Sequence, residues 1–386
     1  MTNRALQFGP IQKARFVERP NRFLVRCHVD RLGIVEAFLP NPGRLWELLL
    51  PDATLFLTPA AELDDSLTSR RKTRHTVLAV ERDGTPIFLH THFTNRVARF
   101  LIERKRIPYL ADTEVMRAEV PVGNSRFDFL LRKGGRDVYL EVKSCTLFGN
   151  GVAMFPDAVT ERGQRHLLEL ASLGRRRARP VVLFLVHTPC VQWFMPDYHT
   201  DLAFSQSLLK VRNKVQVLPV AVEWNRDLSL GPDVKTLEVP WAYLRREVKD
   251  RGSYLLLLRL EKNTSIEVGR LGRFLFQRGY YLYVGSAMRN LTARIDRHSR
   301  QRKKLHWHID YLRQAADRVI ALPIRSSERQ ECEIAQAFSN VFPHGPNRFG
   351  SSDCNCTAHL FWHPTNPLEH QSFHAVLQQY RMNRPC

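Results

Sequence analysis

The sequence predicts a multidomain chain of mixed α/β (α+β) class, on three observations. With 386 residues, 44% of them hydrophobic, the chain is long enough for two or three domains with their own cores. Between residues 20 and 100, short alternating apolar segments are separated by glycine and proline turns, which is typical of a small barrel. Beyond residue 100, strand-like and helix-like patterns follow one another, which indicates sheets that carry helices.

In the first region, residues 23–29 alternate apolar and polar side chains, residues 35–39 run into the turn Pro40-Asn-Pro-Gly43, and residues 55–57 form a third apolar segment. A basic cluster follows and precedes the apolar run 77–80. It is either a solvated loop or a rim that contacts phosphates, where lysine and arginine gain affinity through counterion release. Its members are Arg70, Arg71, Lys72 and Arg74.

Asn95 and Arg96 open an expected helix that extends to Lys105. The next signal is Gly134-Gly135 between two alternating segments, which predicts a β-hairpin because both central residues of a type I′ turn need positive φ. If these glycines form the turn, residues whose numbers sum to 269 face each other. Asp128 then faces Glu141.

The pair Asp128 and Glu141 indicates a cation site. Facing residues of an antiparallel pair have Cβ atoms about 5 Å apart, so two carboxylates can share one Mg²⁺ or Mn²⁺. Lys143 points to the same face as Glu141, and its ammonium can orient water or stabilise developing charge during phosphodiester hydrolysis. The alternative is a solvent-facing strand whose charges pair across the surface.

After the hairpin, Asp157 or Thr160 is expected to cap a helix that continues to residue 172. Leu167, Leu170 and Ala171 give this helix a core-facing stripe. The continuous apolar run 180–187 predicts a buried strand.

A new pattern begins after the charged segment 245–251. Residues 254–258 and 279–286 read as strands, and residues 290–298 have helical spacing. On that helix Arg294 shares a face with Leu291, Ile295 and His298. An inward arginine is costly unless it meets an anion, so we expect a phosphate site.

Cysteines and histidines gather near the C-terminus. Cys354, Cys356 and His359 fall within one loop, and His306 or His308 is a candidate fourth ligand for a structural Zn²⁺. Metal-free buried cysteines are the alternative.

Composition favours a polyanionic partner. The formal net charge is +20 and the pI is about 10.1, spread along the chain, which favours nucleic acid. We find no apolar run of 18 residues, so no membrane partner is expected. The N-terminus lacks an apolar signal core, and seven cysteines at irregular spacing argue against a disulfide framework. A cytoplasmic location is expected.

Residues 10–245 resemble the sugar fermentation stimulation protein A (SfsA) family and the PD-(D/E)xK nuclease motif. The likeness is carried by residues 125–129, 139–144 and 155–166, which contain Asp128 and Glu141-Val-Lys143. It implies an OB-like barrel in residues 1–100, a nuclease-like domain in 101–245, and DNA binding. It also implies a polar residue from the following helix at the site; Gln164 is the candidate, although an exposed helix face explains it equally. Arg162 and Arg165 of that helix are candidate nucleic-acid contacts.

Residues 251–386 resemble the GIY-YIG nuclease superfamily. The likeness is carried by Gly252-Ser-Tyr254 and by the pattern Y-V-G-S-x-x-x-N-L-x-x-R-I-x-x-H from Tyr283 to His298. It implies that Tyr254 or Tyr283 positions or activates water, that Arg294 neutralises the phosphate, and that Glu331 binds metal, with Glu333 as the less favoured ligand.

Together these expectations describe a metal-dependent nuclease with two candidate centres. The alternative is a DNA-binding or regulatory protein that uses nuclease folds only for binding. DNA is favoured over RNA by the family resemblance alone, since the basic charge serves either polymer. The sequence does not address the oligomeric state.

Overall fold

The computed structural model describes every residue except 1–5, 7, 61–72, 175–177 and 384–386. It divides the chain into two compact units. Unit 1 comprises Met1–Asp197 and Ala203–Trp241, and unit 2 comprises Tyr198–Leu202 and Ala242–Pro385. The ranges expected for the barrel and for the first nuclease-like domain both fall mainly in unit 1.

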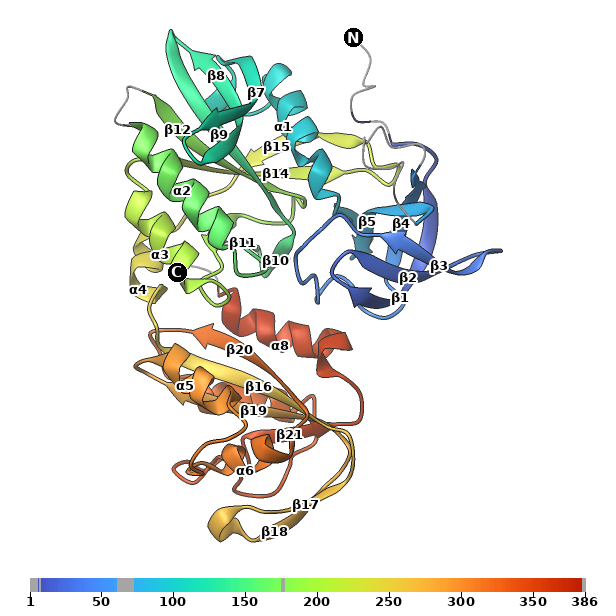
Figure 1. Cartoon of the computed structure of the whole chain (residues 1–386), viewed down its shortest axis with the longest axis vertical. Coiled ribbons are helices and arrows are strands. Elements are labelled where there is room, and N and C mark those ends of the chain that lie inside the picture. The colour runs from blue at the N-terminus through green and yellow to red at the C-terminus, as the bar shows by residue number, and fades with distance from the viewer. Residues whose placement is uncertain (1–5, 7, 61–72, 175–177, 384–386) are drawn as a thin grey trace. The chain divides into compact units, whose positions relative to one another are not determined.

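The N-terminal part of unit 1 is a closed barrel. Its sheet has the strand order β3-β2-β1-β4-β5-β6, and an additional parallel pairing of β3 with β5 closes five strands on themselves (Figure 1). Val25, Cys27 and Val29 alternate along β2 and are fully buried, as the sequence pattern predicts. The expected OB-like barrel is confirmed. Its strands are β1 (Gln12–Asn21), β2 (Leu24–Val29), β3 (Gly33–Phe38), β4 (Thr54–Pro59), β5 (His75–Arg82) and β6 (Thr85–Phe88).

Most of the basic cluster, namely Arg70, Arg71 and Lys72, lies outside the described residues. Arg74 is described and is exposed directly before β5. The contact of this cluster with phosphates therefore stays a prediction.

The second part of unit 1 is a six-stranded sheet with a helix on each face. Strand β12 lies inside the order β15-β14-β12-β9-β8-β7 and pairs in parallel with both β9 and β14. Its side chains alternate between two apolar clusters: Leu183 packs in the cluster that contains Leu101 of α1, and Phe184 in the cluster that contains Leu170 of α2. Burial on both faces explains its continuous apolar run. The elements are α1 (Thr94–Glu103), β7 (Glu114–Val122), β8 (Ser125–Lys133), β9 (Arg136–Cys145), α2 (Glu161–Leu173), β12 (Arg179–Val186), β14 (Gln216–Trp224) and β15 (Leu230–Thr236).

The hairpin of β8 and β9 has the predicted turn and register. Gly134 and Gly135 have φ values of 52° and 74°, as a type I′ turn requires. The paired residues run from Lys133 opposite Arg136 to Phe129 opposite Leu140, and each pair sums to 269. The recorded ladder ends one pair before Asp128 and Glu141.

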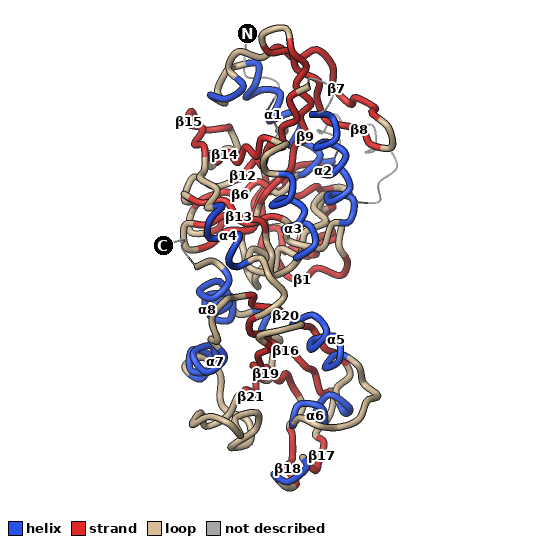
Figure 2. The backbone as a smooth tube through the Cα atoms, turned by 90° about the vertical axis from the view of Figure 1, so that its left-hand side faces the viewer, coloured by secondary structure: helices blue, strands red, loops and turns tan. Residues whose placement is uncertain are grey.

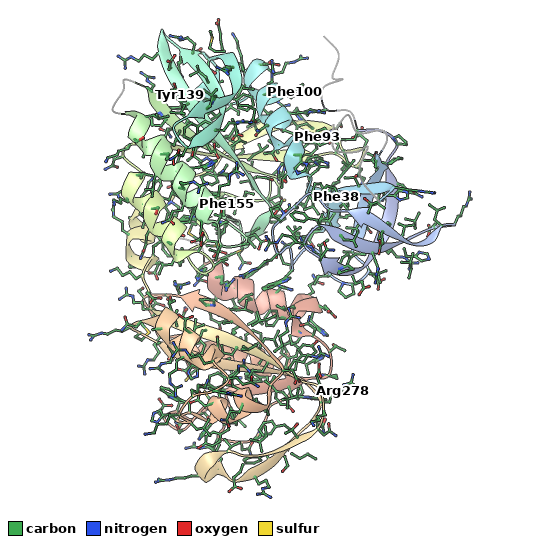
Figure 3. The ribbon with its side chains drawn as sticks, viewed as in Figure 1. Phe38, Phe93, Phe100, Tyr139, Phe155 and Arg278 are labelled. Carbon is green, nitrogen blue, oxygen red and sulfur yellow. The ribbon has the colours of Figure 1, made fainter. Side chains whose placement is uncertain are left out.

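The remaining elements of unit 1 pack on the α2 side. Phe155, labelled in Figure 3, lies with its ring centroid 5.3 Å from that of Phe184 and 5.5 Å from that of Phe204 on α3. These contacts join the small sheet β10-β11-β13 and α3 to the α2 face of the large sheet. The elements are β10 (Leu147–Gly149), β11 (Val152–Phe155), β13 (Trp193–Pro196) and α3 (Leu202–Val211).

Unit 2 is built on an antiparallel sheet of order β20-β16-β19-β21. Figure 2 shows α5 and α6 on one side of this sheet and α7 and α8 on the other. The two expected strands and the expected helix correspond to β16, β19 and α5. The elements are α4 (Trp241–Glu247), β16 (Gly252–Leu260), β17 (Thr264–Glu267), β18 (Arg273–Phe276), β19 (Gly279–Ala287), α5 (Leu291–Ser299), α6 (His308–Ala315), β20 (Arg318–Arg325), α7 (Glu331–Ser339), β21 (Leu360–His363) and α8 (Gln371–Arg381).

Candidate functional site

The first candidate site is centred on Glu141 in β9, whose side chain is buried although it carries a carboxylate. Only 4% of the residue is exposed. Its Oε1 accepts hydrogen bonds from Lys143 Nζ at 2.5 Å and from His166 Nδ1 at 2.8 Å. Its Oε2 is buried and has no hydrogen-bond partner among the described residues. A solvent-facing strand with ordinary surface pairs is therefore excluded for Glu141.

Asp128 lies on the neighbouring strand β8 and is held in place through both of its oxygens. Asn95 Nδ2 on α1 donates to Oδ1 at 2.7 Å, and the backbone N–H of Val142 donates to Oδ2, also at 2.7 Å. The β8–β9 pairing ends at Phe129 and Leu140. Just beyond this end, the Asp128 carboxylate accepts a hydrogen bond from the backbone N–H of Val142 in β9. This bond fixes the carboxylate beside the strand that carries Glu141.

The charge of Glu141 affects the protonation of Asp128. Burial, and next the charge of Glu141, raise the pKa of Asp128 to about 6, against the hydrogen bonds from Val142 and Asn95. For Glu141, burial acts to raise the pKa, but the His166 hydrogen bond and the Lys143 ammonium outweigh it and hold the pKa below its ordinary value. The part of this pKa rise that comes from Glu141 is the effect expected when two carboxylates lie close together.

This arrangement fits a hard divalent cation. Two carboxylates converge, one buried carboxylate oxygen is left without a partner in the described structure, and both are oxygen donors of the kind that Mg²⁺ and Mn²⁺ prefer. A bound cation would satisfy Glu141 Oε2 and remove the repulsion that raises the pKa of Asp128.

The residue of α2 that reaches this site is His166, not Gln164. Gln164 Nε2 donates to Ser207 Oγ at 2.8 Å and to the carbonyl oxygen of Ala203 at 3.3 Å, so its amide is hydrogen-bonded to α3. Residues i and i+2 of a helix point in directions about 200° apart around its axis. Gln164 and His166 therefore lie on different faces of α2.

Two arginines of α2 reach the solvent. Arg162 and Arg165 are both exposed, and Arg162 Nε lies 3.4 Å from His166 Nε2. An Arg162 that donates to Nε2 leaves the histidine proton on Nδ1, where it is donated to Glu141. The contact of these two arginines with nucleic acid stays a prediction.

The sequence interpretation missed two residues of this site, Asn95 and His166. His166 had a signal, because it lies in the helical stripe with Gly163, Leu167 and Leu170, all of which are buried. A histidine among core-facing positions needs a polar partner. Asn95 had no comparable signal, because its approach to Asp128 depends on how α1 packs on the sheet.

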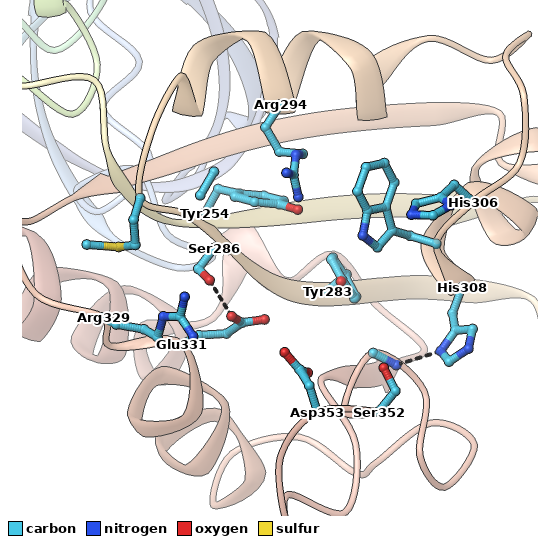
Figure 4. A pocket seen from close by; sticks show the side chains of 14 residues that line it. Tyr254, Tyr283, Ser286, Arg294, His306, His308, Arg329, Glu331, Ser352 and Asp353 are labelled. Carbon is cyan, nitrogen blue, oxygen red and sulfur yellow. Dashed lines mark hydrogen bonds between the residues drawn. The ribbon is translucent and has the colours of Figure 1, made fainter.

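The second candidate site is a cavity of about 450 Å³ in unit 2, shown in Figure 4. It brings together the four residues that the sequence grouped from distant segments. Tyr254 lies on β16, Tyr283 on β19, Arg294 on α5 and Glu331 on α7, and all four line the cavity. His306 and His308 also line it.

Tyr254 packs so closely against β19 that it explains Gly285. Tyr254 faces Gly285 across the β16–β19 pair, and a Cβ at Gly285 would lie 2.5 Å from atoms of the Tyr254 ring. Burial raises the pKa of Tyr254 despite the nearby Arg294 guanidinium, and it raises the pKa of Tyr283 as well. Both phenols keep their protons at neutral pH, which suits hydrogen-bond donation better than proton abstraction.

Arg294 and Glu331 are positioned by contacts on opposite walls of the cavity. The Arg294 guanidinium stacks on Trp307 at 4.5 Å from the ring centroid and is directed to the Tyr254 hydroxyl (Figure 4). Glu331 accepts a hydrogen bond from Ser286 Oγ and lies 3.2 Å from His359 Nδ1. The less favoured Glu333 is exposed on the same helix.

Asp310 of α6 supports this cavity from behind, and its side chain is completely buried. Its carboxylate accepts hydrogen bonds from Arg297, His298 and the backbone N–H groups of His306 and Trp307. Burial acts to raise its pKa, but these hydrogen bonds outweigh it and hold the pKa well below the ordinary value. His298 in turn stacks on Tyr254. Asp310 thereby fixes both the loop that carries Trp307 and the helix that carries Arg294.

The expected zinc ligands are only partly brought together. Cys354, Cys356 and His359 form a group of potential metal ligands, but the fourth member is Cys332 of α7 and neither His306 nor His308. His308 Nδ1 instead accepts a hydrogen bond from the backbone N–H of Gly350. Loop spacing could not reveal Cys332, because it depends on the packing of α7 beside the loop.

Three protein-family models match successive parts of the chain. They are the SfsA N-terminal OB domain at residues 17–89, the sugar fermentation stimulation protein RE domain at residues 92–227, and DUF123, a domain of unknown function, at residues 253–382. The third model carries no GIY-YIG description, so that likeness stays a prediction.

Several curated proteins resemble half or more of the chain. The sugar fermentation stimulation protein homolog of Desulfitobacterium hafniense is 32% identical over 235 residues, which are 61% of this chain and 99% of that protein. The homolog of Moorella thermoacetica is 39% identical over 51% of this chain and 82% of that protein. The solved structure of Pyrococcus furiosus SfsA in complex with Ca²⁺ is 26% identical, with a TM-score of 0.55, over 61% of this chain and 98% of that chain.

The substitution Asp310→Asn is expected to destabilise unit 2 by roughly 3–5 kcal/mol, because it removes the charge that compensates Arg297 and the buried Lys303 ammonium. Urea denaturation followed by tryptophan fluorescence measures the loss. Asp296→Asn, on the exposed side of α5, is the matched control and should change stability by less than about 0.5 kcal/mol. Equal stabilities of the two variants would contradict the supporting role of Asp310.

Proposed function

Because the chain belongs to the sugar fermentation stimulation protein (SfsA) family, we propose that it binds nucleic acid and hydrolyses phosphodiester bonds with a divalent cation. The principal centre is formed by Asp128, Glu141 and Lys143. The cavity of unit 2 is proposed as a second phosphodiesterase centre of GIY-YIG type.

One observation carries the proposal for the first centre. Glu141 is buried, with one oxygen bonded to Lys143 and His166 and the other without a partner in the described residues. Beside it is a second carboxylate, Asp128, whose pKa is raised by burial and next by the charge of Glu141. Most buried carboxylate oxygens in proteins have a hydrogen-bond partner. The related Pyrococcus furiosus SfsA is known as a Ca²⁺ complex, and Ca²⁺ shares with Mg²⁺ the preference for oxygen ligands.

The roles of the chain's own residues follow from these contacts. When bound, the cation supplies Lewis acidity and lowers the pKa of a water. Asp128 and Glu141 provide its oxygen ligands, and His166 holds the Glu141 carboxylate in one orientation. Lys143, bonded to Oε1, places an ammonium where it orients a water or stabilises charge on the phosphate.

In the second centre, three hydrogen-bond donors and one carboxylate line the cavity of unit 2. Tyr254 and Tyr283 are protonated donors that position water or phosphate, and Arg294 neutralises the phosphate charge. Glu331 supplies an oxygen ligand for the cation. Its hydrogen bond from Ser286 and its contact with His359 orient the carboxylate.

The partner is proposed to be DNA first and RNA second. The formal charge of +20 serves either polymer, and the preference for DNA rests on the family likeness. Among the described residues, no helix has the length and apolar character needed to cross a membrane. A DNA-binding protein without cleavage is the competing function, and the variants below separate it from the enzyme.

Glu141→Gln and Lys143→Met are each expected to slow cleavage at the first centre by about 100-fold or more, the size expected for the loss of one electrostatic contact. The assay is cleavage of supercoiled plasmid, single-stranded DNA and RNA with Mg²⁺ or Mn²⁺. Glu114→Gln, exposed on β7 of the same sheet, is the control that should cut at the wild-type rate. If wild-type protein binds these substrates but cuts none with either metal, the enzyme proposal fails.

Arg294→Ala and Glu331→Gln should abolish whatever cleavage persists when the first centre is disabled by Glu141→Gln. Arg289→Ala, which removes an exposed arginine just before α5, should leave this activity intact. Residual cutting that is unaffected by Arg294→Ala and Glu331→Gln would contradict a second centre in unit 2.

Arg162→Ala and Arg165→Ala should weaken binding of DNA duplexes of any sequence to a similar extent, because they are proposed to contact phosphates. In the plot of log affinity against log salt concentration, each substitution should reduce the slope by about 1. Fluorescence anisotropy at several salt concentrations measures both effects. An affinity that does not change with salt would contradict phosphate-based binding.

A further inference from the structure

Four soft donor atoms meet in unit 2, beside the cavity. The Sγ atoms of Cys332, Cys354 and Cys356 and a ring nitrogen of His359 all lie within 4.8 Å of one another. In the described part of the chain, this is the one group of three or more cysteine, histidine or acidic residues with such spacing. Three thiols and one imidazole are a donor set typical of structural zinc.

One distance between donor atoms has the value expected in a tetrahedral zinc site. Cys354 Sγ lies 3.5 Å from His359 Nε2. In a tetrahedron with Zn–S near 2.3 Å and Zn–N near 2.0–2.1 Å, neighbouring ligand atoms are roughly 3.5–3.8 Å apart. The six cysteines in the described residues are all free thiols, so a disulfide does not account for the gathering of three of them.

His359 is oriented for a metal on one side and for a carboxylate on the other. Its Nε2 faces Cys354, and its Nδ1 lies 3.2 Å from Glu331 Oε1. Its backbone bonds to Phe349 and to Val284 of β19, each at 2.9 Å, and the residue is 1% exposed. A metal on Nε2 leaves the proton on Nδ1, where it is donated to Glu331 in the carboxylate–histidine–zinc arrangement.

The cluster also joins the two segments that carry acids into the cavity. Glu331 immediately precedes Cys332, and Asp353 immediately precedes Cys354. Both carboxylates line the cavity, and Figure 4 shows them on the same wall. A metal bound by both cysteines would therefore set the separation of α7 from the loop, and with it the separation of the two acids.

We propose that unit 2 holds a structural zinc ion on Cys332, Cys354, Cys356 and His359, and that this ion positions Glu331 through His359. The zinc site stands without the proposed nuclease function. Only the use of a positioned Glu331 in catalysis rests on that function.

The first experiment measures metal in the purified full chain. We expect about one zinc per chain by elemental analysis, and zinc release in proportion to the thiols modified when the wild type is titrated with an organomercurial. Reconstitution with Co²⁺ should give the absorption of tetrahedral cobalt with thiolate ligands. The titration needs no variant, so it tests the site even if substitutions impair folding.

Variants then identify the ligands. Cys332→Ser and Cys356→Ser should each lose zinc or bind it at least tenfold more weakly in competition with a chromophoric chelator. Cys190→Ser, which removes an exposed cysteine of unit 1, should retain the wild-type stoichiometry. Wild-type protein that contains no zinc and takes up no Co²⁺, or Cys332→Ser with undiminished zinc affinity, would overturn the proposal.

The positioning role has a separate readout. Glu331→Gln leaves all four ligands intact, yet it should lower zinc affinity about 10- to 100-fold, because it weakens the hydrogen bond that orients His359. Glu333→Gln, two residues away and exposed on the same helix, should leave zinc affinity unchanged. Equal affinities of the two variants would overturn the link to Glu331, whereas absent cleavage with normal zinc binding would count only against the nuclease proposal.

Discussion

The buried charge of Glu141 is the constraint around which unit 1 is organised. A carboxylate that is 4% exposed in the middle of a sheet is costly unless its charge is balanced. His166 of α2 and Lys143 of β9 donate hydrogen bonds to one oxygen of this carboxylate. Asp128 adds a second carboxylate close to Glu141 instead of a further positive charge. Repulsion between two buried acids destabilises the protein by itself, and the proposed cation would offset it.

Features that depend on neighbouring residues in the chain could be predicted from the sequence. Gly134 and Gly135 determine a type I′ turn, and the turn alone fixes the register that brings the strand of Asp128 beside that of Glu141. Helical periodicity places Arg294 on the inner face of α5, where the structure shows it in the cavity with Tyr254. In both cases a short segment carries all the information.

Features that depend on packing between distant segments could not be predicted in the same way. Asn95 reaches Asp128 only because α1 packs on the large sheet, and Cys332 joins Cys354 only because α7 lies beside the loop before β21. The Gln164 amide is hydrogen-bonded to α3 and not to Glu141, because the position of α3 decides which side of α2 faces the site. The apolar stripe that contains His166 was a usable signal, since a polar side chain in such a stripe requires a partner.

Anomalous diffraction from crystals of the full chain grown with Mn²⁺ tests the proposed cation site directly. We expect an anomalous peak within coordination distance of both Asp128 and Glu141 Oε2, and its loss in crystals of Glu141→Gln. Wild-type crystals with no peak at these carboxylates, or with Lys143 or a water as the sole partner of Glu141 Oε2 at saturating Mn²⁺, would contradict a cation site and with it the proposed chemistry of unit 1.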